Sequence, residues 1–286
     1  MYNLTPSVTL SYFGIERYEN GSYQITRNDK QFYTNLEEVI KCGFKAIEFE
    51  TAAPWNKEEE RENYPYVKQV AKNVYESGVL FNSVHLPFSI SWWDFASPSE
   101  EQRKGAVEVF KRAVDAYGEF MPNVFVIHPG IKPQEQDGNE REIRLNQLAK
   151  SMQEVCDFCP KTVCIENMVN DGLLNKISEA KDLLNAVPKL NMTIDVNHSF
   201  LQKPEDYILE IGSRVKNLHI SDNNGVKEQH WLPGTGVINF NAVLSALEKT
   251  GYNGTFNYEL SPLKLGSTYK ELYDIHVKLF NDYNNL

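Results

Sequence analysis

Cysteine and long apolar runs are both scarce in this sequence. Four cysteines are too few to form a disulfide framework in a chain of 286 residues. No apolar run approaches the roughly 20 residues that cross a bilayer, and the N-terminal residues lack the basic and apolar regions of a signal peptide. We therefore expect a cytoplasmic protein with reduced thiols and no membrane partner.

Runs of lysine or arginine are missing as well. The chain holds 29 basic and 39 acidic residues, which gives a formal net charge of −10. Binding to nucleic acid depends on basic groups that neutralise phosphates. The charge therefore disfavours nucleic acid as a partner, although a local basic patch would not show in this total.

Glycine-rich phosphate loops and flexible linkers are also absent. Without a glycine fingerprint after an early strand, a doubly wound nucleotide-binding sheet is disfavoured. No segment rich in proline, glycine or serine divides the chain. Hydrophobic residues make up 41% and charged residues 24%, an ordinary globular composition. We expect one folded domain that spans residues 1–286.

Two of the cysteines, Cys156 and Cys159, form a CxxC motif near the end of a predicted helix. A structural zinc site would need a second pair of ligands nearby, and the sequence has no second CxxC. We interpret the two cysteines as packed thiols, with a redox role as the alternative.

What the sequence does contain is an alternation of short apolar runs with longer amphipathic stretches. The short runs predict strands at 8–14, 45–50, 80–87, 123–130, 161–168, 190–198, 215–223 and 254–262. The longer stretches predict helices at 31–42, 64–77, 99–119, 140–159, 177–187, 204–212, 239–250 and 267–283. Nearly continuous apolar runs suit parallel strands that are buried on both faces. Eight βα units of about 36 residues each are typical of a closed barrel, so the predicted fold class is α/β, a single (β/α)8 TIM barrel.

Residues that bind metals gather at the ends of six predicted strands. They are His85, His128, Glu166, Asp195, His198, His219 and Glu259. Because the carboxyl ends of barrel strands meet at one rim, Glu166, Asp195, His219 and Glu259 are expected to converge. Mixed oxygen and nitrogen ligands suit one divalent ion of Mn, Co, Mg or Zn, with positions left open for substrate oxygens. Any one of these residues alone could instead cap a helix or join a structural ion pair.

The motifs around these residues resemble the xylose-isomerase-like TIM barrel superfamily, which holds sugar phosphate isomerases and epimerases and is related to endonuclease IV. The motifs are Ile165-Glu166-Asn167, Asp195-Val196-Asn197-His198, His219-Ile220-Ser221-Asp222, the segment from His230 to Gly236, and Tyr258-Glu259. The resemblance covers essentially the whole chain. It implies a metal-dependent isomerase or epimerase of a sugar or polyol-derived ketone, in which Glu166 and Glu259 exchange a proton with the substrate through an enediolate.

The resemblance to endonuclease IV implies a second hypothesis, a metal-dependent nuclease for abasic-site DNA with more than one zinc ion. Its further ligands would be His85, His128, His198, Glu228 and His230, which in the sugar-handling branch could contact substrate instead. Two residues depart from the nuclease pattern, because Glu228 stands where that family has aspartate and Thr235 where it usually has glutamate. For His198 and His230, a bond to a loop carbonyl or plain solvation is the alternative.

The substrate is less well defined by the sequence. Trp55, Trp92 and Trp93 follow predicted strands and could stack on a sugar, although a packed loop explains them equally well. Gly225 stands where ketose epimerases have an arginine, which puts a free ketohexose in doubt. We expect a small, unphosphorylated carbohydrate. A sugar-binding barrel without turnover is the third hypothesis, and a homo-oligomer is usual in the family.

Overall fold

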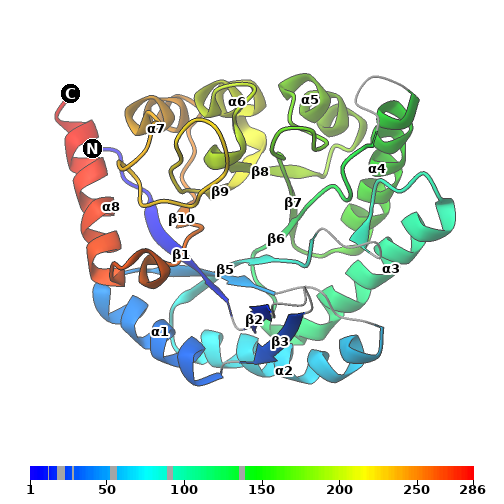
Figure 1. Ribbon diagram of the computed structural model, residues 1–286, viewed down its shortest axis with the longest axis horizontal. Coiled ribbons are helices and arrows are strands. Elements are labelled where there is room, and N and C mark those ends of the chain that lie inside the picture. The colour runs from blue at the N-terminus through cyan, green and yellow to red at the C-terminus, as the bar shows by residue number, and fades with distance from the viewer. Residues whose placement is uncertain (12, 18–22, 28, 52–56, 89–92, 135–138) are drawn as a thin grey trace.

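A computed structural model describes residues 1–11, 13–17, 23–27, 29–51, 57–88, 93–134 and 139–286. Eight parallel strands form one sheet in the order β10-β1-β4-β5-β6-β7-β8-β9 (Figure 1). They are β1 (Thr5–Ser11), β4 (Ala46–Glu50), β5 (Leu80–His85), β6 (Val124–Ile127), β7 (Thr162–Glu166), β8 (Asn191–Asp195), β9 (Val215–His219) and β10 (Thr255–Tyr258). A parallel bridge between Ile220 and Tyr258 joins the two ends of the sheet. The predicted (β/α)8 barrel is confirmed.

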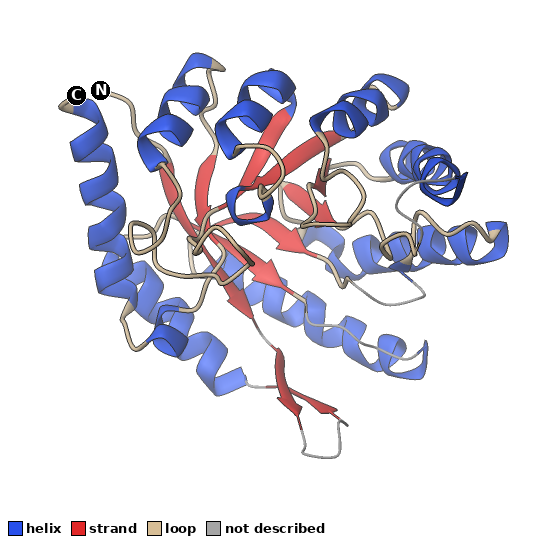
Figure 2. Ribbon diagram, turned by 45° about the horizontal axis from the view of Figure 1, so that its top comes forward, coloured by secondary structure: helices blue, strands red, loops and turns tan. Residues whose placement is uncertain are grey.

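Helices surround the barrel on its outside (Figure 2). They are α1 (Asp29–Cys42), α2 (Lys57–Glu76), α3 (Glu100–Tyr117), α4 (Asn139–Phe158), α5 (Ile177–Ala186), α6 (Pro204–Ile211), α7 (Phe240–Lys249) and α8 (Tyr269–Asn284). Short 3-10 turns lie at η2 (Gly118–Phe120), η3 (Val196–His198), η4 (Gly212–Arg214) and η5 (Pro262–Leu265). Side-chain caps mark some starts: Ser99 accepts a hydrogen bond from the Gln102 backbone and Asn239 from that of Ala242. The apolar faces of the helices and strands form one large core between the two layers.

The first predicted strand is placed wrongly by three residues at each end. β1 begins at Thr5, because Thr5 pairs with Thr255 of β10, and it ends at Ser11. Residues beyond the barrel then form an antiparallel hairpin of β2 (Phe13–Arg17) and β3 (Tyr23–Arg27), which the strand prediction missed. Figure 2 shows this hairpin projecting beyond the end of β1. Residues that favour strands continue beyond Ser11, so the sequence alone does not show where β1 leaves the barrel.

The register of the parallel strands sets which side chains share the mouth of the barrel. Ser11 of β1 pairs with Glu50 of β4, and Glu50 pairs in turn with His85 of β5. On the other side, Asp195 of β8 pairs with His219 of β9. Since residues two apart point to the same face of a strand, this layer lies directly above the inward-facing Glu48. Polar side chains of β1, β4, β5, β8 and β9 therefore share the mouth.

The structure also bears on the expectations about the cysteines and about membrane-spanning segments. Cys156 and Cys159 are free and buried, in agreement with packed thiols. Burial raises the pKa of the Cys156 thiol to about 12, which opposes thiolate chemistry. In the part of the chain that the structure describes, no helix is both long and apolar enough to cross a membrane.

Candidate metal centre and active site

The four residues of the predicted metal quartet meet at the carboxyl end of the barrel. Glu166, Asp195 and His219 end strands β7, β8 and β9, and Glu259 directly follows β10. One ligand atom from each lies within 4.8 Å of the other three. The His219 Nδ1 atom, for example, is 3.2 Å from Glu166 Oε1 and 3.4 Å from Glu259 Oε2. The tertiary structure thus brings the quartet together as the strand-end pattern predicts.

Three atoms of this quartet are buried without a hydrogen bond from any described residue. They are Glu166 Oε1, Asp195 Oδ2 and His219 Nδ1. A buried polar atom left unsatisfied costs about 1–3 kcal/mol, and more when it carries charge. Three such atoms of metal-ligand type facing one point fit a divalent cation. The donor set of three carboxylates and one imidazole suits Mn²⁺, Co²⁺, Mg²⁺ or Zn²⁺.

Glu48, which the sequence interpretation missed, holds the ring of His219 from below. The His219 Nε2 atom donates to the Glu48 carboxylate, 3.0 Å from Oε1, and this leaves Nδ1 facing the quartet. Glu48 is fully buried inside the barrel and also accepts hydrogen bonds from four polar side chains. These donors are Thr9, Ser83, Asn217 and Asn257.

This environment keeps Glu48 ionised. Burial would raise the pKa of the Glu48 carboxyl, but the charge of His219 and the hydrogen bonds from His219 and Ser83 lower it overall. A carboxylate behind a ligating histidine selects the ring tautomer and makes the other nitrogen a better ligand. Glu48 is thus a positioning residue for His219.

We expect Glu48→Gln to weaken metal affinity roughly 10- to 100-fold, because the amide cannot replace the charged acceptor of His219. Titration of metal-free protein with Mn²⁺ or Zn²⁺ by calorimetry measures this change. Ser7→Ala is the matched control, since Ser7 belongs to the same interior network through Asn257 but is not one of the described hydrogen-bond donors to Glu48. Equal affinities in the Glu48→Gln variant and the control would show that Glu48 only fills space.

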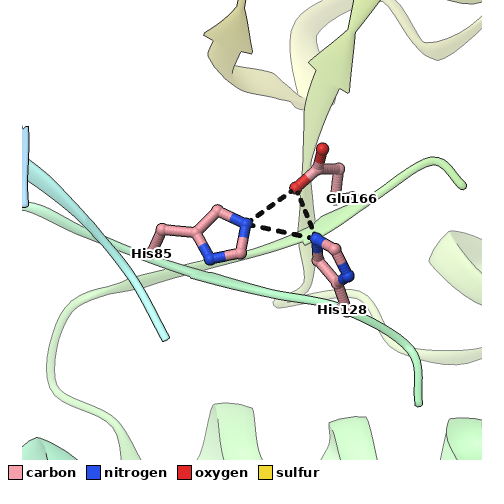
Figure 3. A group of neighbouring side chains, drawn as sticks. All are labelled: His85, His128 and Glu166. Atoms are coloured by element: carbon pink, nitrogen blue, oxygen red, sulfur yellow. Dashed lines mark hydrogen bonds and ion pairs between the residues drawn. The ribbon is translucent and has the colours of Figure 1, made fainter. Parts of the chain in front are cut away.

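A second cluster joins the quartet at Glu166 (Figure 3). The Nε2 atoms of His85 and His128 lie 3.3 and 3.2 Å from Glu166 Oε2, and 3.2 Å from each other. The Nδ1 atom of His85 donates to the Leu86 carbonyl at 2.9 Å, since a carbonyl can only accept. A neutral His85 would therefore turn the lone pair of Nε2 towards the carboxylate. A proton or a metal ion between the two groups relieves this repulsion.

A third cluster contains His198, Glu228 and His230. The Glu228 Oε1 atom is 3.4 Å from His198 Nε2 and 2.6 Å from His230 Nε2. The other ring nitrogens are fixed by backbone carbonyls, because His198 Nδ1 donates to Asn167 at 2.8 Å and His230 Nδ1 to Glu259 at 2.7 Å. All nine candidate residues are thus near one another at the mouth.

The loop that carries Glu228 and His230 folds back over the mouth, as the sequence suggests. Asp222, which sequence reasoning did not single out, holds the far end of this loop through four backbone N–H groups. These belong to Asn223, Gly234, Gly236 and Ile238. A side chain at Gly236 would place its first carbon 2.1 Å from the Asn223 carbonyl oxygen, so only glycine permits this approach.

The pKa values of the two glutamates of the quartet are shifted in opposite directions. Burial favours the neutral form of Glu166, but the charges of the nearby His219 and His128 hold its pKa well below the ordinary value. Burial, together with the carboxylates of Glu166 and Asp195, raises the pKa of Glu259 to about 8. Carboxyl groups whose pKa values are pushed apart are suited to acid and base roles. A bound cation would lower the pKa of both.

The mouth opens into a cavity of about 940 Å³. Phe88 lines it and stacks on His128 with ring centroids 4.6 Å apart. Trp93 is 4% exposed and packs against Phe95 in the core, and the lining does not include it, so the structure places Trp93 away from a sugar-stacking position. Trp55 and Trp92 lie outside the described residues.

Comparison with known sequences yields relatives of modest identity. An uncharacterized protein of Methanocaldococcus jannaschii is 29% identical over 211 residues, which cover 70% of this chain and 71% of that protein. Fructoselysine 3-epimerase of Shigella flexneri is 24% identical over 179 residues, 56% of this chain and 60% of the enzyme. The protein named "probable endonuclease 4" of Thermotoga petrophila is 25% identical over 170 residues, 51% of this chain and 57% of that protein.

Solved structures with the same fold match nearly the whole chain. A D-tagatose 3-epimerase-like protein superposes with a TM-score of 0.72 at 21% identity, covering 97% of this chain and 98% of the other. D-psicose 3-epimerase from Clostridium cellulolyticum H10 gives a TM-score of 0.71 at 17% identity, with 97% and 98% coverage. Residues 36–274 match the profile of one sequence family. The chain therefore belongs to the xylose isomerase-like TIM barrel family.

Proposed function

We propose that this protein is a metal-dependent isomerase or epimerase of a small carbohydrate or polyol-derived ketone. The observation that carries the proposal is the pair of glutamates in the quartet. Glu166 and Glu259 come from strands β7 and β10, with β8 and β9 between them in the barrel. They approach one site from two sides, as carboxylates must if they are to reach both faces of a substrate carbon.

The chemistry follows from the environments of these two side chains. A divalent cation held by Glu166, Asp195, His219 and Glu259 would polarise a substrate carbonyl and acidify the neighbouring C–H bond. The ionised Glu166 is suited to removing that proton. Glu259, which reaches the site from β10, is placed to return a proton from the other side.

The cavity and the relatives support a small substrate. A volume of about 940 Å³ lies in the range of small-molecule sites. Among its described lining residues Lys264 is the one lysine or arginine, which favours an unphosphorylated sugar. The Shigella flexneri relative is a fructoselysine 3-epimerase, a name consistent with sugar epimerisation.

Solvent-proton exchange tests this function. The metal-loaded protein is incubated in D₂O with a panel of ketoses and polyol-derived ketones, and NMR follows deuterium uptake at the carbon beside the carbonyl. We expect uptake with at least one compound, lowered about 10²- to 10⁴-fold in Glu166→Gln and Glu259→Gln. Metal content is measured in each preparation, so that rates are compared per loaded protein.

Glu101→Gln serves as the control, because Glu101 is exposed at the start of α3 and does not line the cavity. It should exchange protons at the wild-type rate. Metal-loaded wild-type protein that exchanges no proton of any compound would contradict the proposal and favour the sugar-binding barrel without turnover.

The second candidate, a nuclease acting at abasic sites, is favoured by one observation. His85, His128 and Glu166 form a group that could hold a metal beside the quartet, and the His198, Glu228 and His230 cluster lies at the same mouth. The net charge of −10 opposes binding to a duplex. Nicking of a duplex with a single abasic site, by protein that holds two or three zinc ions, would place this candidate first.

A further inference from the structure

The part of the cavity away from the metal quartet has a composition of its own. The quartet lies on β7 to β10, whereas β1, β4, the start of α1 and the η5 turn line the other part. The described residues there include Ser11, Gln31, Asn35, Glu50, Leu263, Lys264 and Leu265. Two of these are charged, Glu50 and Lys264. This region would hold the part of a substrate that does not react.

Of these two charged residues, Glu50 lies on a strand of the barrel next to the reacting region. It is the last residue of β4, pairs with His85 of β5, and lies in the layer above Glu48. Neighbouring strands are about 4.8 Å apart. His85 in turn is 3.3 Å from Glu166 and 4.0 Å from Glu259. A group bound by Glu50 would thus sit one strand away from the proposed acid and base.

Glu50 also lacks the partners that its neighbours have. Glu48 accepts five side-chain donors, and Glu228 is paired with His198 and His230. For Glu50 the described residues provide no hydrogen bond or ion pair, although it is only partly exposed. A partly buried carboxylate that lines a cavity without a partner can accept charge-assisted hydrogen bonds from a ligand.

The charged residues around the cavity indicate whether that ligand is a cation or an anion. Four glutamates are among the described residues of the lining: Glu50, Glu166, Glu228 and Glu259. Lys264 is the one described lysine or arginine of the lining, and its side chain is exposed at the rim on η5. Beside Glu50, which has no described partner, the local field therefore favours a cationic group over a phosphate.

We propose that the substrate is a carbohydrate bearing a positively charged amine close to its reacting carbons, and that Glu50 binds this amine. The inference rests on the proposed function, because it takes the cavity as a carbohydrate site. It narrows the substrate class to aminodeoxy ketoses and their N-substituted derivatives. Neutral ketohexoses and sugar phosphates would lack the group that Glu50 recognises.

Three ligands that differ only at C1 test this class: D-fructose, 1-amino-1-deoxy-D-fructose and D-fructose 1-phosphate. Binding to metal-loaded protein is measured by calorimetry. We expect the amino sugar to bind about 10-fold or more tightly than fructose, and the phosphate to bind more weakly than fructose. The advantage of the amino sugar should shrink as salt rises.

Two variants of the same cavity form the matched pair. Glu50→Gln should remove the preference for the amino sugar while leaving the affinity for fructose within about twofold, because the amide keeps the shape of the side chain and loses only its charge. Lys264→Gln should keep the preference. Circular dichroism and metal content confirm that both variants are folded and loaded.

An undiminished preference in Glu50→Gln would overturn the inference. The inference would also be overturned if D-fructose 1-phosphate bound most tightly of the three ligands and Lys264→Gln abolished this binding. Deuterium uptake tests the proposed function separately. If all three sugars exchanged equally and Glu50→Gln had no effect, the isomerase activity would be supported and recognition of an amine by Glu50 would be refuted. If the preference for the amino sugar depended on Glu50 but no sugar took up deuterium, recognition of an amine by Glu50 would be supported and the isomerase activity would be refuted.

Discussion

We expect the wild-type protein to hold a divalent metal tightly and the Asp195→Asn, Glu259→Gln double variant to lose it. The two substitutions remove two of the three carboxylates of the quartet and leave Glu166 and His219 as its only members. Because a cation in this site is held mainly by these charges, occupancy should fall from about one ion per chain to a small fraction. Elemental analysis of dialysed protein measures the ion and its amount.

The same measurement separates the two candidate functions. About one ion in the wild-type protein supports the isomerase, and two or three zinc ions support the nuclease. A Glu101→Gln, Glu142→Gln variant controls for lost negative charge, since both residues are exposed and neither lines the cavity. Wild-type protein that holds no metal under any loading condition would remove the basis of both functions.

The second large effect concerns stability. Arg141 near the start of α4 is 6% exposed, and its Nε and one terminal nitrogen each donate to the Glu179 carboxylate at 2.7 Å. It also donates to the Gly172 carbonyl and the Asn175 side chain, which tie down the loop after β7. We expect Arg141→Met to lower the free energy of unfolding by about 3–5 kcal/mol, because Glu179 would keep a buried charge without its main partner.

Urea-induced unfolding, followed by circular dichroism, measures this loss. Lys150→Met on the same helix is the control: among the described residues its exposed side chain donates to Gln147 alone, so the change should stay within about 0.5 kcal/mol. An Arg141→Met, Glu179→Met double variant should recover part of the loss, since the unpaired charge is gone. A loss below 1 kcal/mol in Arg141→Met would show that solvent or other groups satisfy Glu179.

Secondary structure and the metal quartet could be predicted from the sequence for the same reason. Most strands are short apolar runs with a polar residue at or directly after the carboxyl end, and parallel strands align these ends whatever their distance in sequence. Glu166, Asp195, His219 and Glu259 could thus be brought together without knowing any contact. The first strand was misplaced because its limits depend on pairing with β10 rather than on its own residues.

Sequence reasoning missed residues whose roles depend on contacts with other segments of the chain. Glu48 lies in the middle of an apolar strand, and its role appears only when the register places it beneath His219. Asp222 acts through backbone groups up to 16 residues away, which no spacing rule indicates. Trp93 is the opposite case: it was predicted to stack on a sugar because it follows a strand, yet its side chain is buried in the core.

The sequence by itself determined the barrel, the approximate limits of its helices and the four residues at the centre of its mouth, because periodicity and strand-end chemistry are local properties. Only the tertiary structure decided which nitrogen of each histidine faces the centre, which carboxylates lie beneath or beside it, and that Glu50 faces the cavity without a described partner. These depend on register, ring orientation and the closing of loops. They arise from contacts between distant segments, and such contacts form only when the chain folds.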